Sequence, residues 1–272
     1  MSHLLLPIPF QPLLLREYHD VLKQQYHKRF TLSPCDPPGP GASDIVYKAA
    51  YWKDERLQSM KKRLNETKSQ LNNLPLDKWH KHTRKLNPAA LVPNHVKKSS
   101  NPELLTQAWL KFHECFHVFS LGPGTEVKQF TSVHLCEAPG AFITSLNHAL
   151  VLHHPEVVWN WMATTLNPHY EGNDLGYMIN DDRFIMGSLD HWNFGVDNTG
   201  NLLNRDNMEK LVKDSGKLSE SGTVDLVTAD GSVDCQSDPG RQVHSAFDVR
   251  LLLKLYSHNR KALWRTSIWP RL

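Results

Sequence analysis

The alternation of apolar and polar residues is clearest in the middle of the chain. A short apolar run, residues 133–136, is bounded by polar residues and leads directly into Ala138-Pro139-Gly140. A helical period follows, in which the apolar residues share one face: Phe142, Ile143, Leu146, Ala149 and Leu150. Strand, tight turn and helix in this order predict the first βα unit of an open α/β sheet. Gly140 allows a backbone to approach a ligand closely, but an ordinary βα turn explains the segment equally well.

Two later segments predict further strands of the same sheet. Residues 157–165 (VVWNWMATT) and residues 223–229 (TVDLVTA) are rich in β-branched and aromatic side chains. Asp230-Gly231-Ser232 follows the second of them, at the carboxyl end of the strand, where a carboxylate faces the ligand crevice of such sheets. Between the two strands, residues 173–199 are expected to be mostly loop and residues 205–219 to form a helix.

One helix is predicted just before the sheet. Asn101-Pro102-Glu103 has the composition of a helix start, and the helical period continues to about Phe119. Lys111 lies at the edge of the apolar stripe of this helix and not on its opposite face. Its ammonium group either reaches past apolar neighbours to water or points into a site at the sheet edge.

The N-terminal part divides into two predicted regions. Residues 1–44 are expected to be a disordered leader, because residues 33–43 (SPCDPPGPGAS) are rich in Pro and Gly. Residues 45–100 are expected to form a helical extension. Its first helix, within residues 45–74, has apolar residues at helical spacing: Leu57, Met60, Leu64, Leu71 and Leu74. We expect this stripe to pack on the domain, with a partner helix as the alternative.

The composition of the chain only excludes some classes of protein and site. The 272 residues carry a net charge of +3, 40% are hydrophobic and 22% are charged, which is ordinary for a soluble protein. The apolar residues 4–15 are interrupted by three prolines and preceded by no basic residue, so neither a signal peptide nor a spanning helix is expected. The four cysteines lack any CxxC spacing and no metal site is expected, which favours reduced thiols in the nucleus or cytoplasm.

Residues 78–98 interleave basic side chains with an aromatic one. Lys78, Lys81, Arg84 and Lys85 surround Trp79, and two more lysines follow at residues 97 and 98. Such a run suits a nucleic-acid backbone and a stacked base. A solvated helix face without a partner has the same composition, so RNA binding remains one of two interpretations.

Three predicted features meet at the carboxyl edge of the sheet: the Gly140 turn, Asp230 and Lys111. A lysine and an aspartate above a glycine turn suit methyl transfer from S-adenosylmethionine to a hydroxyl group. The sulfonium donor is already activated, so the protein mainly aligns the reactants. An ammonium group stabilises a developing alkoxide, and an aspartate keeps that ammonium placed and charged.

From residue 76 to about residue 240, the chain resembles the FtsJ-like ribose 2'-O-methyltransferases, and within them the Adrift-type branch, which modifies the second transcribed nucleotide of capped mRNA. The resemblance rests on seven motifs: LDKWHKHT (76–83), LLTQAWLKFHE (104–114), HLCEAPGAFITSLNH (134–148), TLNPHYEGND (165–174), DDRFI (181–185), HWNFGVDNTGN (191–201) and DLVTADGSVDCQ (225–236). It implies a Rossmann-like methyltransferase domain over residues 101–272, with S-adenosylmethionine as methyl donor and capped mRNA as substrate.

The resemblance also implies roles for single residues. Lys111 corresponds to the first catalytic lysine, and Asp230 to the catalytic aspartate that also borders the donor. Gly140 corresponds to the glycine against the donor, and Trp159 to a donor-binding aromatic. From the residues alone, Trp159 is read as sheet core.

The last residues depart from the family. It has a second catalytic lysine in a GGSFVLK-like strand, whereas here Lys254 follows Asp230 by only 24 residues and no Gly-Gly turn precedes it. Residues 250–263 read either as a crossover and strand or as one basic amphipathic helix. Only 42 residues follow Asp230, and a crossover with its strand already takes a dozen or more. We therefore expect an incomplete sheet with a poorly covered edge beside the strand before Asp230, and no measurable methyl transfer.

Two other functions remain open. A chain that keeps the fold but only binds donor or capped RNA is the first. A nicotinamide-dependent oxidoreductase is the second, and it is disfavoured because the GxGxxG fingerprint and the ribose-binding acid are both missing.

Overall fold

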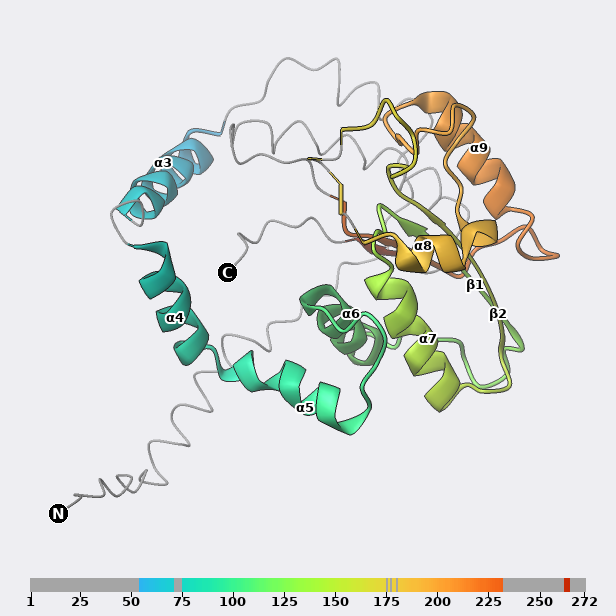
Figure 1. Cartoon of the computed structure of the whole chain (residues 1–272), viewed down its shortest axis with the longest axis horizontal. Helices are drawn as coiled ribbons and strands as arrows, with labels where there is room; N and C mark the ends of the chain where they lie inside the picture. Colours follow the sequence, from blue (N-terminus) through green and yellow to red (C-terminus); the bar gives the residue numbers. More distant parts are fainter. Residues whose placement is uncertain are drawn as a thin grey trace. The chain divides into compact units, whose positions relative to one another are not determined.

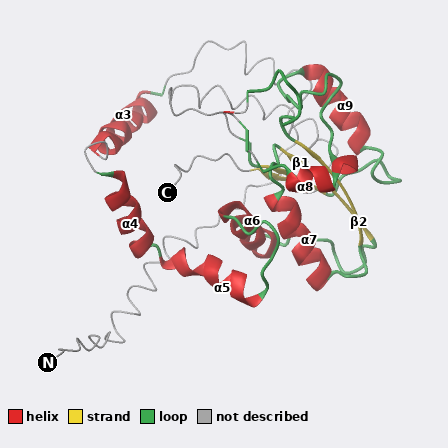
Figure 2. Cartoon of the chain, in the orientation of Figure 1, coloured by secondary structure: helices red, strands yellow, loops and turns green. Residues whose placement is uncertain are grey.

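The computed structural model describes residues 54–70, 75–174, 176, 178–179, 181–231 and 262–264, all within Ala49–Leu272, one of two units into which the chain divides. Figure 1 gives the element order and Figure 2 the element types. The α-helices are α3 (Glu55–Ser69), α4 (Leu76–Leu86), α5 (Val92–Ser99), α6 (Gln107–Val118), α7 (Ala141–His153), α8 (Arg183–Gly187) and α9 (Arg205–Ser215). Two 3-10 helices are η2 (Pro88–Leu91) and η4 (Leu189–His191), and the strands are β1 (Gln129–Leu135), β2 (Val158–Thr164), β3 (Leu226–Ala229) and β4 (Ala262–Trp264).

The strands form one parallel sheet in the order β2-β1-β3-β4. β1 is central and pairs along its whole length with β2, from Gln129 opposite Val158 to Leu135 opposite Thr164. Parallel strands require crossover connections; α7 lies in the connection from β1 to β2, and α8 and α9 lie in the connection from β2 to β3. The predicted α/β fold class is confirmed, and the three expected strands are present with slightly different ends.

Helices cover both faces of the sheet. Because side chains alternate along a strand, Phe130 and Leu226 face one way and Val133 and Val227 the other. The first pair packs against α6 and α7, in a cluster that includes Phe112, Phe116, Phe142, Leu146 and Leu150. The second pair packs against Leu211 of α9. This arrangement leaves the carboxyl ends of β1 and β3 between the two helical layers.

The strand beyond β3 differs from expectation. Ala262–Trp264 pairs in parallel with Val227–Ala229, so the prediction of an uncovered edge beside β3 is wrong. The reading of residues 250–263 as one helix is also wrong at its end, because residues 262 and 263 belong to β4. Residues 232–261, with Lys254, lie outside the described part of the chain.

Helix α6 begins later than predicted. Its N-cap is Thr106, whose Oγ1 accepts a hydrogen bond from the Trp109 backbone N–H at 3.2 Å. Asn101 and Leu104 have φ angles of 40° and 50°, which are incompatible with a right-handed helix. The predicted start at Asn101 is therefore wrong. The described part of residues 173–199 is mostly loop, as expected, and also contains the short helices α8 and η4.

The described residues of the N-terminal extension, 54–70 and 75–100, are mostly helical, as expected, but the apolar stripe of α3 is not buried. Leu57, Met60 and Leu64 of α3 are 52%, 53% and 56% exposed, and no residue of α3 is buried. The prediction that this stripe packs on the domain is therefore wrong for these residues, and Leu71 and Leu74 lie outside the described residues, as does the predicted leader, residues 1–44. Within the described residues, no helix is long and apolar enough to cross a membrane.

Candidate functional site

The turn between β1 and α7, residues 136–140, forms the centre of the candidate site. Cys136 has a φ of 55°, the Ala138-Pro139 peptide bond is cis, and Gly140 is the N-cap of α7 with a φ of 111°. Two backbone hydrogen bonds hold the turn: Glu137 N–H donates to Thr164 O at 3.1 Å, and Gly140 N–H donates to Glu137 O at 2.7 Å. The turn is therefore fixed to the carboxyl end of β2 as well as to β1.

The packing of the protein around position 140 requires a glycine there. It is buried, and a Cβ added to it would overlap the ring of Phe184 in α8. Its left-handed φ would strain any other residue. The resemblance implies that Gly140 lies against the donor. The contact with Phe184 shows that a larger residue here disturbs the packing of α8 as well.

Asp230 lies beside this turn. Leu135 is paired with Ala229, so Cys136 and Asp230 are the next residues on neighbouring strands. A Cβ added to Gly231 would lie 2.6 Å from Cys136 Sγ and 2.9 Å from Cys136 Cβ, which shows how closely the two strand ends approach. The structure thus brings Asp230 and the Gly140 turn together at one edge of the sheet, as the sequence predicted.

A second carboxyl group lies at this edge, and sequence reasoning missed it. Glu137 is 5% exposed, and its Oε1 accepts hydrogen bonds from the backbone N–H groups of Phe142 at 2.7 Å and Ile143 at 3.3 Å. Burial raises the pKa of Glu137 to about 8, the two N–H groups oppose the rise, and the charge of Asp230 adds to it. Two features of the sequence could have indicated this role. An acidic residue follows the predicted buried strand, and Gly140 has no side chain with which to cap the next helix.

Lys111 lies on α6, the helix that packs against α7. Its side chain is exposed, and its neighbour Phe112 is fully buried. The ring of Phe112 stacks on Phe142, in the first turn of α7, with centroids 4.7 Å apart. Lys111 is therefore one residue from a contact that fixes α6 against the beginning of α7.

Trp159 lies elsewhere. It is the second residue of β2, five residues before the end of that strand, which corresponds to roughly 16 Å along an extended chain. Its Nε1–H donates to Ser132 Oγ at 2.9 Å, and its ring stacks on Trp161 at 5.9 Å. The structure does not bring Trp159 to the turn, and its role as a donor contact stays a prediction from the resemblance.

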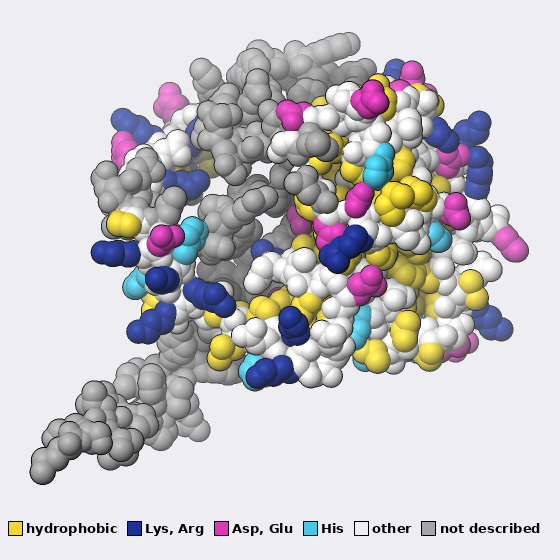
Figure 3. Space-filling view, in the orientation of Figure 1, with side chains coloured by type: hydrophobic (Ala, Val, Ile, Leu, Met, Phe, Trp, Pro, Cys, Tyr) yellow, Lys and Arg dark blue, Asp and Glu magenta, His cyan; other side chains and the backbone are white. Residues whose placement is uncertain are grey.

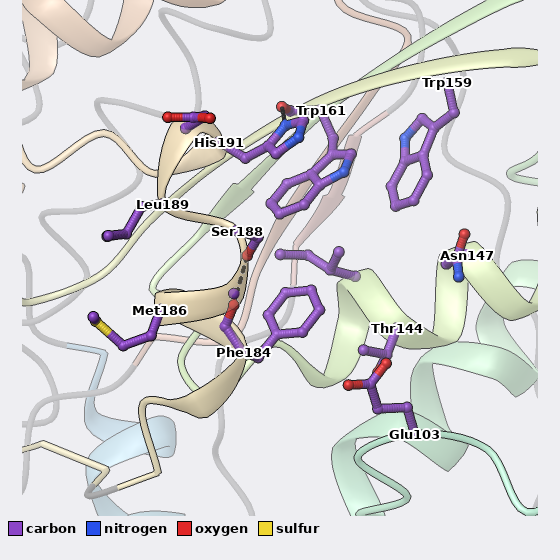
Figure 4. A pocket seen from close by; sticks show the side chains of 13 residues that line it. Glu103, Thr144, Asn147, Trp159, Trp161, Phe184, Met186, Ser188, Leu189 and His191 are labelled. Atoms are coloured by element: carbon purple, nitrogen blue, oxygen red, sulfur yellow. Dashed lines mark hydrogen bonds between the residues drawn. The ribbon is translucent and has the colours of Figure 1, made fainter.

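A pocket of about 530 Å³ is lined by residues of β2, α7, α8 and η4 (Figure 4). Aromatic rings make one wall: Trp161 stacks on His191 at 4.1 Å and on Phe184 at 6.0 Å. Glu103 and Asp190 are its charged lining residues, and no Lys or Arg lines it. Gly140, Lys111 and Asp230 are not among its lining residues, but Trp159 is, and so is Phe184, whose ring packs against Gly140.

The edge fits the chemistry of a sulfonium donor. Asp230 and Gly231 are half-buried and Cys136 is exposed, so backbone and carboxylate are accessible there, while Glu137 adds a second, buried carboxyl group. Among the described residues, no group of three or more His, Cys, Asp or Glu side chains could hold a metal ion.

Comparison with known proteins gives consistent matches. The model of the FtsJ-like methyltransferase family matches residues 104–264, which include the turn, Lys111 and Asp230.

Three similar proteins all carry the name cap-specific mRNA (nucleoside-2'-O-)-methyltransferase 2. The protein of Danio rerio is 48% identical over 189 residues, 69% of this chain and 25% of the relative. The protein of Pongo abelii is 49% identical over 185 residues, 67% of this chain and 24% of the relative. The protein of Mus musculus is 40% identical over 236 residues, 86% of this chain and 30% of the relative. The chain thus spans between 24% and 30% of the length of these proteins.

Proposed function

Because this chain belongs to the FtsJ-like methyltransferase family, we propose that it transfers a methyl group from S-adenosylmethionine to a ribose 2'-hydroxyl of capped mRNA, at the second transcribed nucleotide. The names of its relatives support the cap-specific substrate. The structural observation that carries the proposal is the meeting of the turn at residues 136–140 with Asp230. Both lie within the span that the family model matches.

The donor site would be formed by the backbone of the turn and by Asp230. When bound, S-adenosylmethionine supplies a methyl group that its sulfonium charge has already activated. The half-buried carboxylate of Asp230 attracts that positive charge. Gly140 holds the turn close to α8 through its contact with Phe184, and this fixes the backbone that the donor would touch.

Lys111 and Asp230 would act on the ribose hydroxyl. A hydroxyl group loses its proton as it attacks a methyl group, so negative charge develops on its oxygen. The ammonium group of Lys111 stabilises that charge, and the carboxylate of Asp230 keeps the ammonium group charged and in place. Lys111 is exposed, which leaves it accessible to an RNA strand.

The RNA strand would be bound in part by α4. Lys78, Lys81 and Lys85 are spaced by three and four residues, so they share one face of this helix, and all are exposed. Trp79 is half-buried beside them, with its ring 6.4 Å from that of His82. In Figure 3, Lys and Arg side chains gather over α4. This pattern supports contact with phosphates and a stacked base.

A methyl-transfer assay tests the proposal. Capped RNA and labelled S-adenosylmethionine are incubated with the chain, and uncapped RNA of the same sequence is the control. Label in the 2'-O-methyl position of the second nucleotide of the capped RNA only would support the proposal and contradict the expectation, drawn from the sequence, that this chain transfers no methyl group. Calorimetric titration with S-adenosylhomocysteine measures the donor site separately. Binding of S-adenosylhomocysteine without transfer would instead support the alternative function, a protein that only binds donor or capped RNA.

We also propose a location in the nucleus and cytoplasm, the compartments where mRNA is capped and used. Imaging of a fluorescently tagged chain tests this, and exclusive accumulation in another organelle would contradict it.

A further inference from the structure

The first turn of α7 is capped in an unusual way. A helix begins with four backbone N–H groups that have no partner within the helix, and the N-cap side chain ordinarily satisfies one of them. Here the N-cap is Gly140, which has no side chain to offer. Glu137 supplies the acceptor from three residues earlier, with Oε1 at 2.7 Å from Phe142 N and 3.3 Å from Ile143 N. One carboxyl oxygen thus replaces the missing cap.

The same residue joins three parts of the sheet edge. Its backbone N–H donates to Thr164 O at the end of β2, its backbone O accepts from Gly140 N–H, and its side chain binds the start of α7. The side chain is 5% exposed, so these bonds form away from water, where losing one partner is costly. The backbone of Glu137 thus joins the turn to β2, and its side chain joins the turn to the start of α7.

Glu137 also determines which acceptor binds the N–H groups at the start of α7. The N–H groups at the start of a helix ordinarily bind anions, such as the carboxylate of a ligand. The N–H groups of Phe142 and Ile143 already have a partner within the chain. The amino-acid carboxylate of a donor would therefore be bound by other groups.

We propose that Glu137 is a positioning residue of the donor site, which fixes the turn at residues 136–140 by capping α7 and occupies the helix N-terminus in place of the donor. This inference rests on the proposed function, because it assumes that the turn binds S-adenosylmethionine. Glu137 acts through the backbone of the turn and does not itself touch the methyl group.

Calorimetric titration of the 272-residue chain with S-adenosylhomocysteine tests the role. The Glu137→Ala variant removes the acceptor, and we expect the affinity to fall about tenfold, the scale of one buried hydrogen-bond acceptor. The Glu137→Gln variant keeps an amide oxygen that can accept the same bonds, and we expect it to bind within about threefold of the parent chain. Hydrogen exchange of the Phe142 and Ile143 amides should be faster in the alanine variant than in the glutamine variant.

The control is Thr106→Ala, which removes the N-cap acceptor of α6 but lies outside the turn. It should lower the stability of the chain to a similar degree and leave the affinity for S-adenosylhomocysteine unchanged. An alanine variant at Glu137 that binds as tightly as the parent chain, or a glutamine variant as weak as the alanine variant, overturns the positioning role alone. A parent chain that binds no S-adenosylhomocysteine overturns the proposed function, and this inference with it.

Discussion

The turn at residues 136–140 and the helices of the N-terminal extension are stabilised in different ways. In the turn, Glu137 bonds to Thr164, Gly140 packs on Phe184, and Cys136 lies against Gly231. In α3, no residue is buried, and the side-chain hydrogen bonds join residues three or four positions apart. Contacts between distant residues fix the turn, whereas local contacts suffice for α3. We therefore expect substitutions in the turn to have large effects on donor binding and on the free energy of unfolding. Substitutions in the extension should change the free energy of unfolding little and affect mainly RNA binding at the exposed helix surface.

The largest effect is expected at Gly140. The Gly140→Val variant combines a left-handed φ with overlap against Phe184, so it should lose binding of S-adenosylhomocysteine and lower the free energy of unfolding by more than about 2 kcal/mol. Calorimetry and denaturant unfolding measure the two effects. Gly124→Ala is the control, because a Cβ there would have only an ordinary contact, 3.8 Å from Val127 Cγ2. Equal stability of the two variants would contradict the strained geometry of the turn.

A substitution at Lys111 should lower the rate of methyl transfer without weakening donor binding. In a chain that transfers methyl groups, the Lys111→Ala variant should lower the transfer rate by about a hundredfold, the scale of a lost acid–base or positioning group. Its affinity for S-adenosylhomocysteine should be nearly unchanged, because Lys111 is exposed on α6 and outside the turn. Rate assays and calorimetry on the same preparation check both values. Parallel loss of rate and affinity would show that Lys111 has a structural role.

The buried groups of this region predict opposite dependences of stability on pH. Burial raises the pKa of Glu137 to about 8, above its value in the unfolded chain, so its contribution to stability is complete below pH 4.5 and is lost as pH rises through 8. Burial lowers the pKa of His134 to about 3, so its contribution is present above pH 6.5 and declines as pH falls towards 3. Denaturant unfolding between pH 3 and 9 measures both slopes. The Glu137→Gln variant should lose the decline between about pH 4.5 and 8 and keep the acid-side decline.

The smallest effect on stability is expected in the extension. Replacing Lys78, Lys81, Arg84 and Lys85 of α4 by Gln should change the free energy of unfolding by less than about 0.5 kcal/mol, because all four side chains are exposed. RNA binding should weaken and depend less steeply on salt. The matched control replaces four basic residues of α3: Lys61, Lys62, Arg63 and Lys68. If both sets of substitutions reduce the salt dependence equally, the attraction is a general charge effect and α4 is not a specific RNA-binding surface.

Local patterns were sufficient to predict much of the fold. The apolar run before the Ala138-Pro139-Gly140 turn predicted β1, and the helical period after it predicted α7, which the structure has at Ala141–His153. Asp230 was expected at a strand end because a polar triplet follows a buried apolar segment, and β3 ends at Ala229. These features depend on residues that are close in sequence, so a single sequence carries them.

The errors have a common physical cause. The start at Asn101 looked like a helix cap, but positive φ angles at Asn101 and Leu104 displace the beginning of α6 to Thr106. The apolar spacing of α3 predicted a buried face, yet periodicity does not show whether a partner is present, and Leu57 is 52% exposed. In both cases the outcome depended on contacts and turns that composition does not encode.

The sequence alone determined the fold class, the order of the central elements and the placement of the Gly140 turn and Asp230 at the sheet edge, because strand ends and the glycine turn are local properties. Only the tertiary structure decided what these residues contact. It showed that Phe184, far along the chain, requires a glycine at position 140. It also revealed Glu137 as the cap of α7, since burial beside Asp230 and bonds to Phe142 and Ile143 arise only when β1, β3 and α7 pack together.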